Sequence, residues 1–149
     1  MSLPALVATP TRTSDAQTKA WVAFSGRADM AWLRLLRPGF RHCFAILHDG
    51  HNWITFDPLS NYTDITVLHL PPDFDLPDWL AMRGYRVIRA RLCRAVAKPA
   101  PVAVFNCVEA VKRVLGLHKR SIITPWQLYR YLMRTAGTSR LTSIFNTNH

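Results

Sequence analysis

Apolar residues occur in short runs along this chain, and the spacing within each run predicts its secondary structure. Residues 20–24 are almost continuously apolar and are followed by Ser25-Gly26, a pattern typical of a buried strand. Residues 64–70 and 85–93 instead alternate between apolar and polar positions, which is the period of a strand with one buried face. In the second of these, the positions expected to face the core are Ile88, Ala90 and Leu92. The positions expected to face solvent are Arg89 and Arg91.

The clearest local pattern is a β-hairpin. Residues 41–48 and 51–57 are rich in β-branched and aromatic residues, and Asp49-Gly50 between them is typical of a two-residue turn. With these two residues as the turn, the predicted pairs are His48 with His51, Phe44 with Thr55, and His42 with Asp57. Directly opposed residues share one face of a sheet, so His42 and Asp57 are expected to lie side by side. A register error of one residue would place them on opposite faces.

Capping signals predict the longer helices. Asn106 is a good N-cap and Gly116 occupies the position of a C-cap glycine, which together predict a helix over residues 107–115. Its apolar stripe, expected to pack on the sheet, consists of Cys107, Ala110, Val111 and Val114. The residues of this helix expected to point to solvent are Glu109, Lys112 and Arg113. A capping box over residues 124–127 predicts a second helix that ends at about Arg134.

The order of these elements indicates an α+β fold rather than a series of βαβ units. Short helices are predicted over residues 29–36 and 77–82, and the two longer helices come after the strands. We expect a single domain over residues 20–136. A loose lead-in over residues 1–19 precedes it, and a mobile polar tail over residues 137–149 follows it.

The composition narrows the class of protein. A chain of 149 residues that is 49% apolar and 19% charged is typical of a globular domain and not of a disordered segment. The cysteines, Cys43, Cys93 and Cys107, are odd in number and lack CxxC spacing, which favours a reducing compartment over a disulfide framework. The N-terminus lacks the basic and apolar regions of a signal peptide, and there is no run of about 18 apolar residues. We therefore expect a cytoplasmic protein with no transmembrane segment and no cofactor.

Charge is distributed unevenly along the chain. The formal net charge is +10, but residues 1–78 carry six Lys and Arg against eight Asp and Glu, whereas residues 79–149 carry thirteen against one. A basic half is typical of proteins with an anionic partner such as nucleic acid, an anionic membrane surface or an acidic polymer. It is equally typical of a soluble surface in a protein from an arginine-rich proteome. Charge by itself therefore assigns no reaction.

Cys107 is the candidate nucleophile. In the first turn of a helix, unpaired amides and the helix dipole favour a negative charge, which lowers the pKa of a cysteine and increases its thiolate fraction. His42 can act as a base for Cys107, and Asp57 can hold the ring of His42 in one orientation. The same residues also suit a structural interpretation. In that case Cys107 is a buried hydrophobe, and His42 and Asp57 are a polar pair at the end of the sheet.

The chain order of these residues resembles that of the circularly permuted papain-like, or NlpC-type, cysteine hydrolases. The shared order is a histidine at the start of a strand, a polar residue on the next strand, and later a cysteine that begins a helix. The matching segments are residues 21–24, 40–46, 53–57 and 105–108, and they span about residues 20–135. The resemblance implies an antiparallel β-sheet with the cysteine-bearing helix packed on it.

The resemblance also implies residue roles. Cys107 would be the nucleophile, His42 the general base and Asp57 the orienting third residue, with His42 preferred over His118, which is nearer in sequence. Alternative third residues are Thr55, Asn52 and Asn61. The implied reaction is hydrolysis or acyl transfer at an amide, peptide or ester bond through a thioester intermediate. The substrate classes that suit this reaction are peptides, lipids and cell-wall components.

Three other interpretations remain open. A metal site would use the clustered residues His42, Cys43, His48 and His51, with Cys107 in addition, but their spacing matches no common zinc pattern. A module that binds nucleic acid or an anionic surface would use arginines beside aromatic residues. Those residues are Arg83, Tyr85, Arg86, Arg89, Arg91, Arg94, Trp126, Tyr129, Arg130 and Tyr131. The third alternative is a papain-like domain that has lost its activity and only binds.

Overall fold

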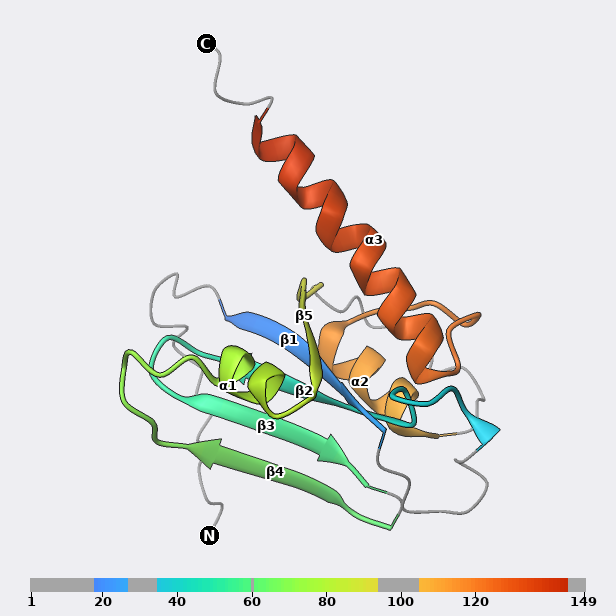
Figure 1. The fold of residues 1–149 in the computed structure, drawn as a ribbon, viewed down its shortest axis with the longest axis horizontal. Coiled ribbons are helices and arrows are strands. Elements are labelled where there is room, and N and C mark those ends of the chain that lie inside the picture. The colour runs from blue at the N-terminus through green and yellow to red at the C-terminus, as the bar shows by residue number, and fades with distance from the viewer. Residues whose placement is uncertain (1–17, 27–34, 60, 94–104, 145–149) are drawn as a thin grey trace, which may run out of the picture.

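The structure is a computed structural model that describes residues 18–26, 35–59, 61–93 and 105–144. Over these residues the fold is α+β, as predicted, with three helices and a five-stranded antiparallel sheet in the order β4-β3-β2-β1-β5 (Figure 1). The strands are β1 (Lys19–Ser25), β2 (His42–His48), β3 (Trp53–Pro58), β4 (Thr63–Leu68) and β5 (Arg86–Ala90). The helices are α1 (Leu76–Met82), α2 (Cys107–Leu115) and α3 (Pro125–Ile144).

The sheet separates two apolar layers, because successive side chains of a strand point to opposite faces. On one face, side chains such as Val22 and Cys43 pack with α2 and α3. On the other face, Ala23 and Ile46 pack with α1. The alternation predicted for residues 85–93 is confirmed, since the inward positions are buried or packed on the core and both arginines are exposed.

Both predicted caps of α2 are present. The side-chain oxygen of Asn106 accepts the amide of Glu109 at 2.9 Å. Gly116 ends the helix with a φ of 68°, in the left-handed region. A Cβ atom at this position would lie 2.3 Å from the carbonyl oxygen of Cys93. The backbone angle and the lack of space therefore both require glycine here.

α3 begins at the predicted capping box but is longer than predicted. The Thr124 hydroxyl accepts the Gln127 amide at 3.3 Å, and the Gln127 side chain accepts the Thr124 amide at 3.0 Å. The helix continues to Ile144 and does not end near residue 134, so the predicted tail over residues 137–149 begins as helix. Residues 135–144 contain no proline, and one glycine lowers helix propensity without ending a helix.

The register of the β2–β3 hairpin differs from the prediction by two residues. His48 pairs with Trp53, not with His51. The reason is the carboxylate of Asp49, which accepts the amides of His51 at 2.8 Å and Asn52 at 2.7 Å. The Asp49 amide also donates to the Asn52 carbonyl at 3.3 Å, so these two residues face each other and the turn lies between them. The predicted pairs Phe44 with Thr55 and His42 with Asp57 are likewise not directly opposed. In each pair, one residue is offset from the other by two positions along its strand.

Two charged residues of α2 that were predicted to point to solvent are buried. The side chains of Lys112 and Glu109 are 6% and 11% exposed, and Lys112 Nζ donates to Glu109 Oε2 at 2.8 Å. Lys112 Nζ also donates to the carbonyl of Ile122 at 3.0 Å. The segment between α2 and α3 therefore covers this side of the helix, a contact that the apolar stripe does not reveal. Arg113 is exposed, as predicted.

The remaining predicted elements are present with ends that differ by a few residues. They are the strands over residues 20–24, 64–70 and 85–93 and the short helix over residues 77–82. Most of the helix predicted over residues 29–36 lies outside the described residues, as does nearly all of the lead-in over residues 1–19. Among the helices of the described residues, none is long and apolar enough to cross a membrane.

Candidate active site

Cys107, His42 and Asp57 come together at one end of the sheet. His42 is the first residue of β2 and Asp57 lies near the end of β3, so the antiparallel pairing of these strands brings both to the same end. Cys107 is the first residue of α2, and α2 packs on β2 and β3. The start of the helix therefore lies beside the strands that carry the other two residues.

His42 and Asp57 are joined by a short hydrogen bond. The ring nitrogen Nε2 of His42 bonds to Oδ1 of Asp57 at 2.6 Å, and the two side chains are 14% and 30% exposed. In the observed register the two residues are diagonal neighbours rather than directly opposed. A shift of two residues keeps a side chain on the same face, so the predicted partners still meet. The bond leaves Nδ1 as the ring nitrogen available to Cys107.

Cys107 carries an acidic thiol. A hydrogen bond from the Cys43 thiol, followed by the hydrogen bond and positive charge of His42, outweighs the effect of burial and lowers the pKa of Cys107 to about 5. The backbone amide of Cys43 also donates to the sulfur. Since an ordinary thiol has a pKa of about 8.5, Cys107 is a thiolate at neutral pH while an ordinary thiol is protonated.

His42 is the positive partner of this thiolate. Burial lowers the pKa of His42, but the hydrogen bonds to Asp57 and Cys107, together with the negative charges of both, raise it to about 9. Each member of the pair therefore stabilises the charged form of the other. Between about pH 5 and pH 9, the site holds a thiolate beside an imidazolium.

Cys43 is a site residue that sequence reasoning missed. Its side chain is fully buried. Burial, followed by the hydrogen bond and charge of Cys107, raises the pKa of Cys43 well above its ordinary value, so it remains a thiol and donates its proton. Alternation along β2 predicts that His42 and Cys43 point to opposite faces. Both nevertheless reach Cys107, because α2 begins at the end of β2 rather than over the middle of one face.

The first turn of α2 leaves two backbone amides without an acceptor within the helix. The Asn106 side chain accepts the amide of Glu109, and the Asn106 carbonyl accepts the amide of Ala110 at 3.0 Å. Among the described residues, no acceptor is found for the amides of Cys107 and Val108. These two donors, next to the sulfur, are suited to stabilising an oxyanion.

The alternative third residues are bonded elsewhere or exposed. The Thr55 hydroxyl donates to the Thr66 carbonyl at 3.5 Å, and the Asn52 side chain bonds to the ring of His69 at 3.0 Å. Asn61 is exposed, as is His118, the histidine nearest to Cys107 in sequence.

Of the histidines in the metal-site interpretation, His42 interacts with Cys107, but His48 and His51 lie at the opposite end of β2 and in the turn that follows it. His48 Nδ1 accepts the amide of Gly50 at 3.2 Å, its ring packs on Trp53, and His51 is exposed. Within the part of the chain that the structure describes, no group of three or more His, Cys, Asp and Glu side chains is arranged to hold a metal ion.

Comparison with known proteins found no relative of this chain. The chain matches no protein-family model, no curated protein sequence and no solved structure. Its function is therefore argued from its own residues.

Proposed function

We propose that this protein is a thiol hydrolase or acyltransferase that acts on an amide, peptide or ester bond. One observation carries the proposal: His42 interacts both with the sulfur of Cys107, whose pKa it lowers, and with Oδ1 of Asp57, to which its Nε2 bonds at 2.6 Å. This arrangement supplies a nucleophile, a group that exchanges protons with the substrate, and a carboxylate that orients that group. Cys107, His42 and Asp57 are the proposed catalytic residues.

The proposed reaction begins with the Cys107 thiolate. Its electron pair forms a bond to the carbonyl carbon of the substrate, and the carbonyl oxygen becomes an oxyanion that accepts the amides of Cys107 and Val108. The oxyanion then collapses and breaks the bond to the leaving amine or alcohol, which takes a proton from His42. A thioester on Cys107 and a neutral His42 remain.

The second half of the reaction restores the site. In a hydrolase, neutral His42 removes a proton from water as the water oxygen attacks the thioester carbon. In an acyltransferase, an amine or hydroxyl group takes the place of water. Collapse of the second oxyanion releases the acyl product and returns the Cys107 thiolate and the His42 imidazolium.

We also propose that the fold is a circularly permuted papain-like fold of the NlpC type. The support is the order of His42, Asp57 and Cys107 in the chain, together with an antiparallel sheet on which the cysteine-bearing helix packs. Peptides, lipids and cell-wall components are the substrate classes that this resemblance favours.

A generic activated ester tests the reaction without knowledge of the natural substrate. We expect p-nitrophenyl acetate to acetylate Cys107 of the full chain, and mass spectrometry to locate the acetyl group there. Hydroxylamine should remove the group, since it cleaves a thioester. The Cys107→Ala variant should release p-nitrophenolate no faster than buffer.

Cys93 provides a matched control, because it is an exposed cysteine of the same chain. The Cys93→Ala variant should be acetylated at Cys107 at the wild-type rate. Acetylation of Cys93 in preference to Cys107, or ester cleavage that persists in Cys107→Ala, would contradict the proposal.

A further inference from the structure

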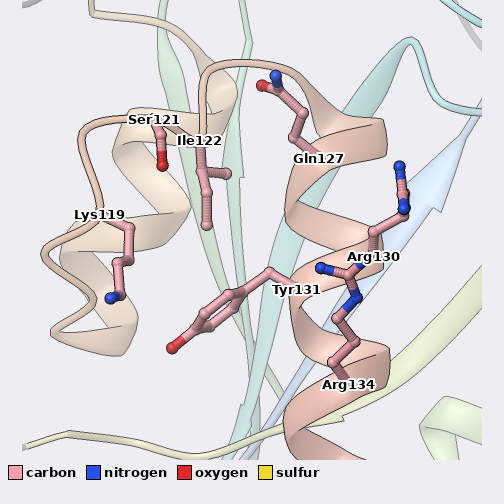
Figure 2. Close-up of a pocket in the computed structure, with 7 residues that line it drawn as sticks. All are labelled: Lys119, Ser121, Ile122, Gln127, Arg130, Tyr131 and Arg134. Atoms are coloured by element: carbon pink, nitrogen blue, oxygen red, sulfur yellow. The ribbon is translucent and has the colours of Figure 1, made fainter.

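A basic groove lies between α3 and the segment that connects α2 to it. Its volume is about 340 Å³. The polar residues that line it are Lys119, Ser121, Gln127, Arg130, Tyr131 and Arg134. Figure 2 shows Lys119 and Tyr131 extending from opposite walls into the space between the segment and the helix, while Arg130 and Arg134 lie one turn apart on α3. Two chain segments and three cations therefore form the groove.

Acidic side chains are scarce in the half of the chain that forms the groove. Glu109 is the single acidic residue within residues 79–149. Its carboxylate is already bonded to Lys112 at 2.8 Å and to Arg113 at 3.3 Å. Among the described residues, no acidic side chain pairs with Lys119 or Arg130. At Lys119 and Arg130, an anion from outside the chain can therefore bind without displacing an acidic side chain of the described residues.

The wall opposite α3 is fixed before any ligand arrives. The buried Lys112 Nζ donates to the Ile122 carbonyl at 3.0 Å, and Asn106 Nδ2 donates to the Ile123 carbonyl at 3.1 Å. From the other side, Gln127 Oε1 accepts the amides of Ile123 at 2.9 Å and Thr124 at 3.0 Å. A preformed wall lowers the entropy cost of binding.

The polar groups of the groove are mostly donors. Lys119, Arg130 and Arg134 are cationic donors, and the hydroxyls of Ser121 and Tyr131 can donate as well. The oxygen of Gln127 is occupied by two amides, so its NH₂ group is the part of that side chain left for a ligand. A phosphate group matches this set, because it has several acceptor oxygens and more than one negative charge, and a guanidinium binds it with two hydrogen bonds.

We infer that this groove binds the phosphate group of a small phosphorylated molecule. Its volume, about 340 Å³, is at the lower end of the range of roughly 300–1,000 Å³ for small-molecule sites. The inference does not depend on the reactivity of Cys107, because none of the groove residues touches the catalytic cluster in the contacts described above.

Calorimetric titration of the full chain with inorganic pyrophosphate at low salt tests the inference. We expect saturable binding with one site per chain. The Arg130→Gln/Arg134→Gln variant should weaken it at least about tenfold, because two charged hydrogen-bond donors to the phosphate oxygens are lost. The single variant Arg130→Gln, at an exposed position, should weaken it by a smaller factor and serves if the double variant does not fold.

Arg89→Gln is the matched control, because Arg89 is an exposed arginine of β5 and its loss removes one charge, as Arg130→Gln does. With the comparison of the variants made at about 0.15 M ionic strength, we expect it to change pyrophosphate binding less than about threefold, because charges more than a Debye length apart are largely screened. An equal loss in Arg89→Gln and Arg130→Gln, or no binding of pyrophosphate, would overturn the inference.

Two further probes separate the chemical class and the size of the ligand. Succinate carries two charges without a phosphate group, and we expect it to bind at least about tenfold more weakly than pyrophosphate. Succinate binding as tight as that of pyrophosphate would overturn the assignment to phosphate. A ten-nucleotide single-stranded DNA that binds about 100-fold more tightly than pyrophosphate, with a steep salt dependence, would overturn the assignment to a small molecule in favour of a polynucleotide.

Discussion

α2 carries two shielded ion pairs whose chemistry differs. At its first residue, the Cys107 thiolate faces the His42 imidazolium. On its flank, the Glu109 carboxylate lies 2.8 Å from the Lys112 ammonium. A thiol and an imidazole ordinarily titrate within about two pH units of neutrality, so a proton can move to and from them during a reaction. A carboxyl and an ammonium group ordinarily titrate further from neutrality and keep their charges.

The ion pair between Glu109 and Lys112 stabilises the packing around α2. Burial raises the pKa of Glu109, but the hydrogen bond and charge of Lys112, followed by those of Arg113, lower it below its ordinary value. Lys112 also holds the Ile122 carbonyl and thereby attaches the segment before α3 to α2. The comparison shows that burial of an ion pair does not identify an active site. The ordinary pKa values of the groups instead distinguish a pair that can exchange protons near neutral pH from a pair that keeps its charges.

Removing the imidazole should have the largest effect on the reactive pair. We expect His42→Ala to reduce the rate of p-nitrophenyl acetate turnover by a factor on the order of 10²–10⁴, because the cation that keeps Cys107 a thiolate and the base that takes a proton from water are both lost. The rate of p-nitrophenolate release measures this. His118→Ala, at an exposed position, is the control and should retain the wild-type rate. A His118→Ala variant that loses the activity instead would reverse the assignment of the base.

Breaking the structural pair should reduce stability instead. We expect Lys112→Met to lower the free energy of unfolding by about 3 kcal/mol, because it leaves a shielded carboxylate without its ammonium partner. Denaturant titration followed by circular dichroism measures this. Glu109→Gln/Lys112→Met should recover part of the loss, since it removes the unpaired charge. Arg113→Gln, at a side chain that is 50% exposed, should cost less than about 1 kcal/mol. A loss in Lys112→Met no larger than in Arg113→Gln would contradict a structural role for the pair.

Removing the thiol next to the nucleophile should have the smallest effect of the three. We expect Cys43→Ala to raise the pKa of Cys107 from about 5 to about 6–7, since one hydrogen bond to the thiolate is lost. Absorbance of the thiolate at 240 nm, followed against pH, measures this. The Cys93→Ala variant should leave the titration unchanged. An equal pKa of Cys107 in the Cys43→Ala and Cys93→Ala variants would contradict the hydrogen bond from the Cys43 thiol to the Cys107 thiolate.

Local patterns in the sequence predicted most of the fold. They also predicted that Cys107, His42 and Asp57 form the candidate site. Apolar runs, alternation and the Asp49-Gly50 turn predicted the strands, and the caps at Asn106 and Gly116 fixed the ends of α2. The contact between the side chains of His42 and Asp57 was predicted from a register that is wrong by two residues. It is nevertheless observed, because an even shift leaves both side chains on one face.

Contacts that depend on how elements pack could not be predicted in this way. Cys43 bonds to Cys107 only because α2 begins at the end of β2, and no spacing within the sequence encodes that placement. The burial of Glu109 and Lys112 depends on the segment that folds back over α2, whereas a helical stripe identifies only one covered face.

The pH dependence of Cys107 alkylation tests the central claim most directly. The full chain is treated with iodoacetamide between pH 4 and pH 10, and mass spectrometry gives the rate at Cys107, with Cys93 as a second thiol in the same sample. Because the pKa of Cys107 is lowered, its thiolate is already present at acidic pH. The rate should be half-maximal at about pH 5 and level between about pH 6 and pH 8. A rate that is half-maximal near pH 8.5, the ordinary value for a thiol, would contradict the thiolate–imidazolium pair.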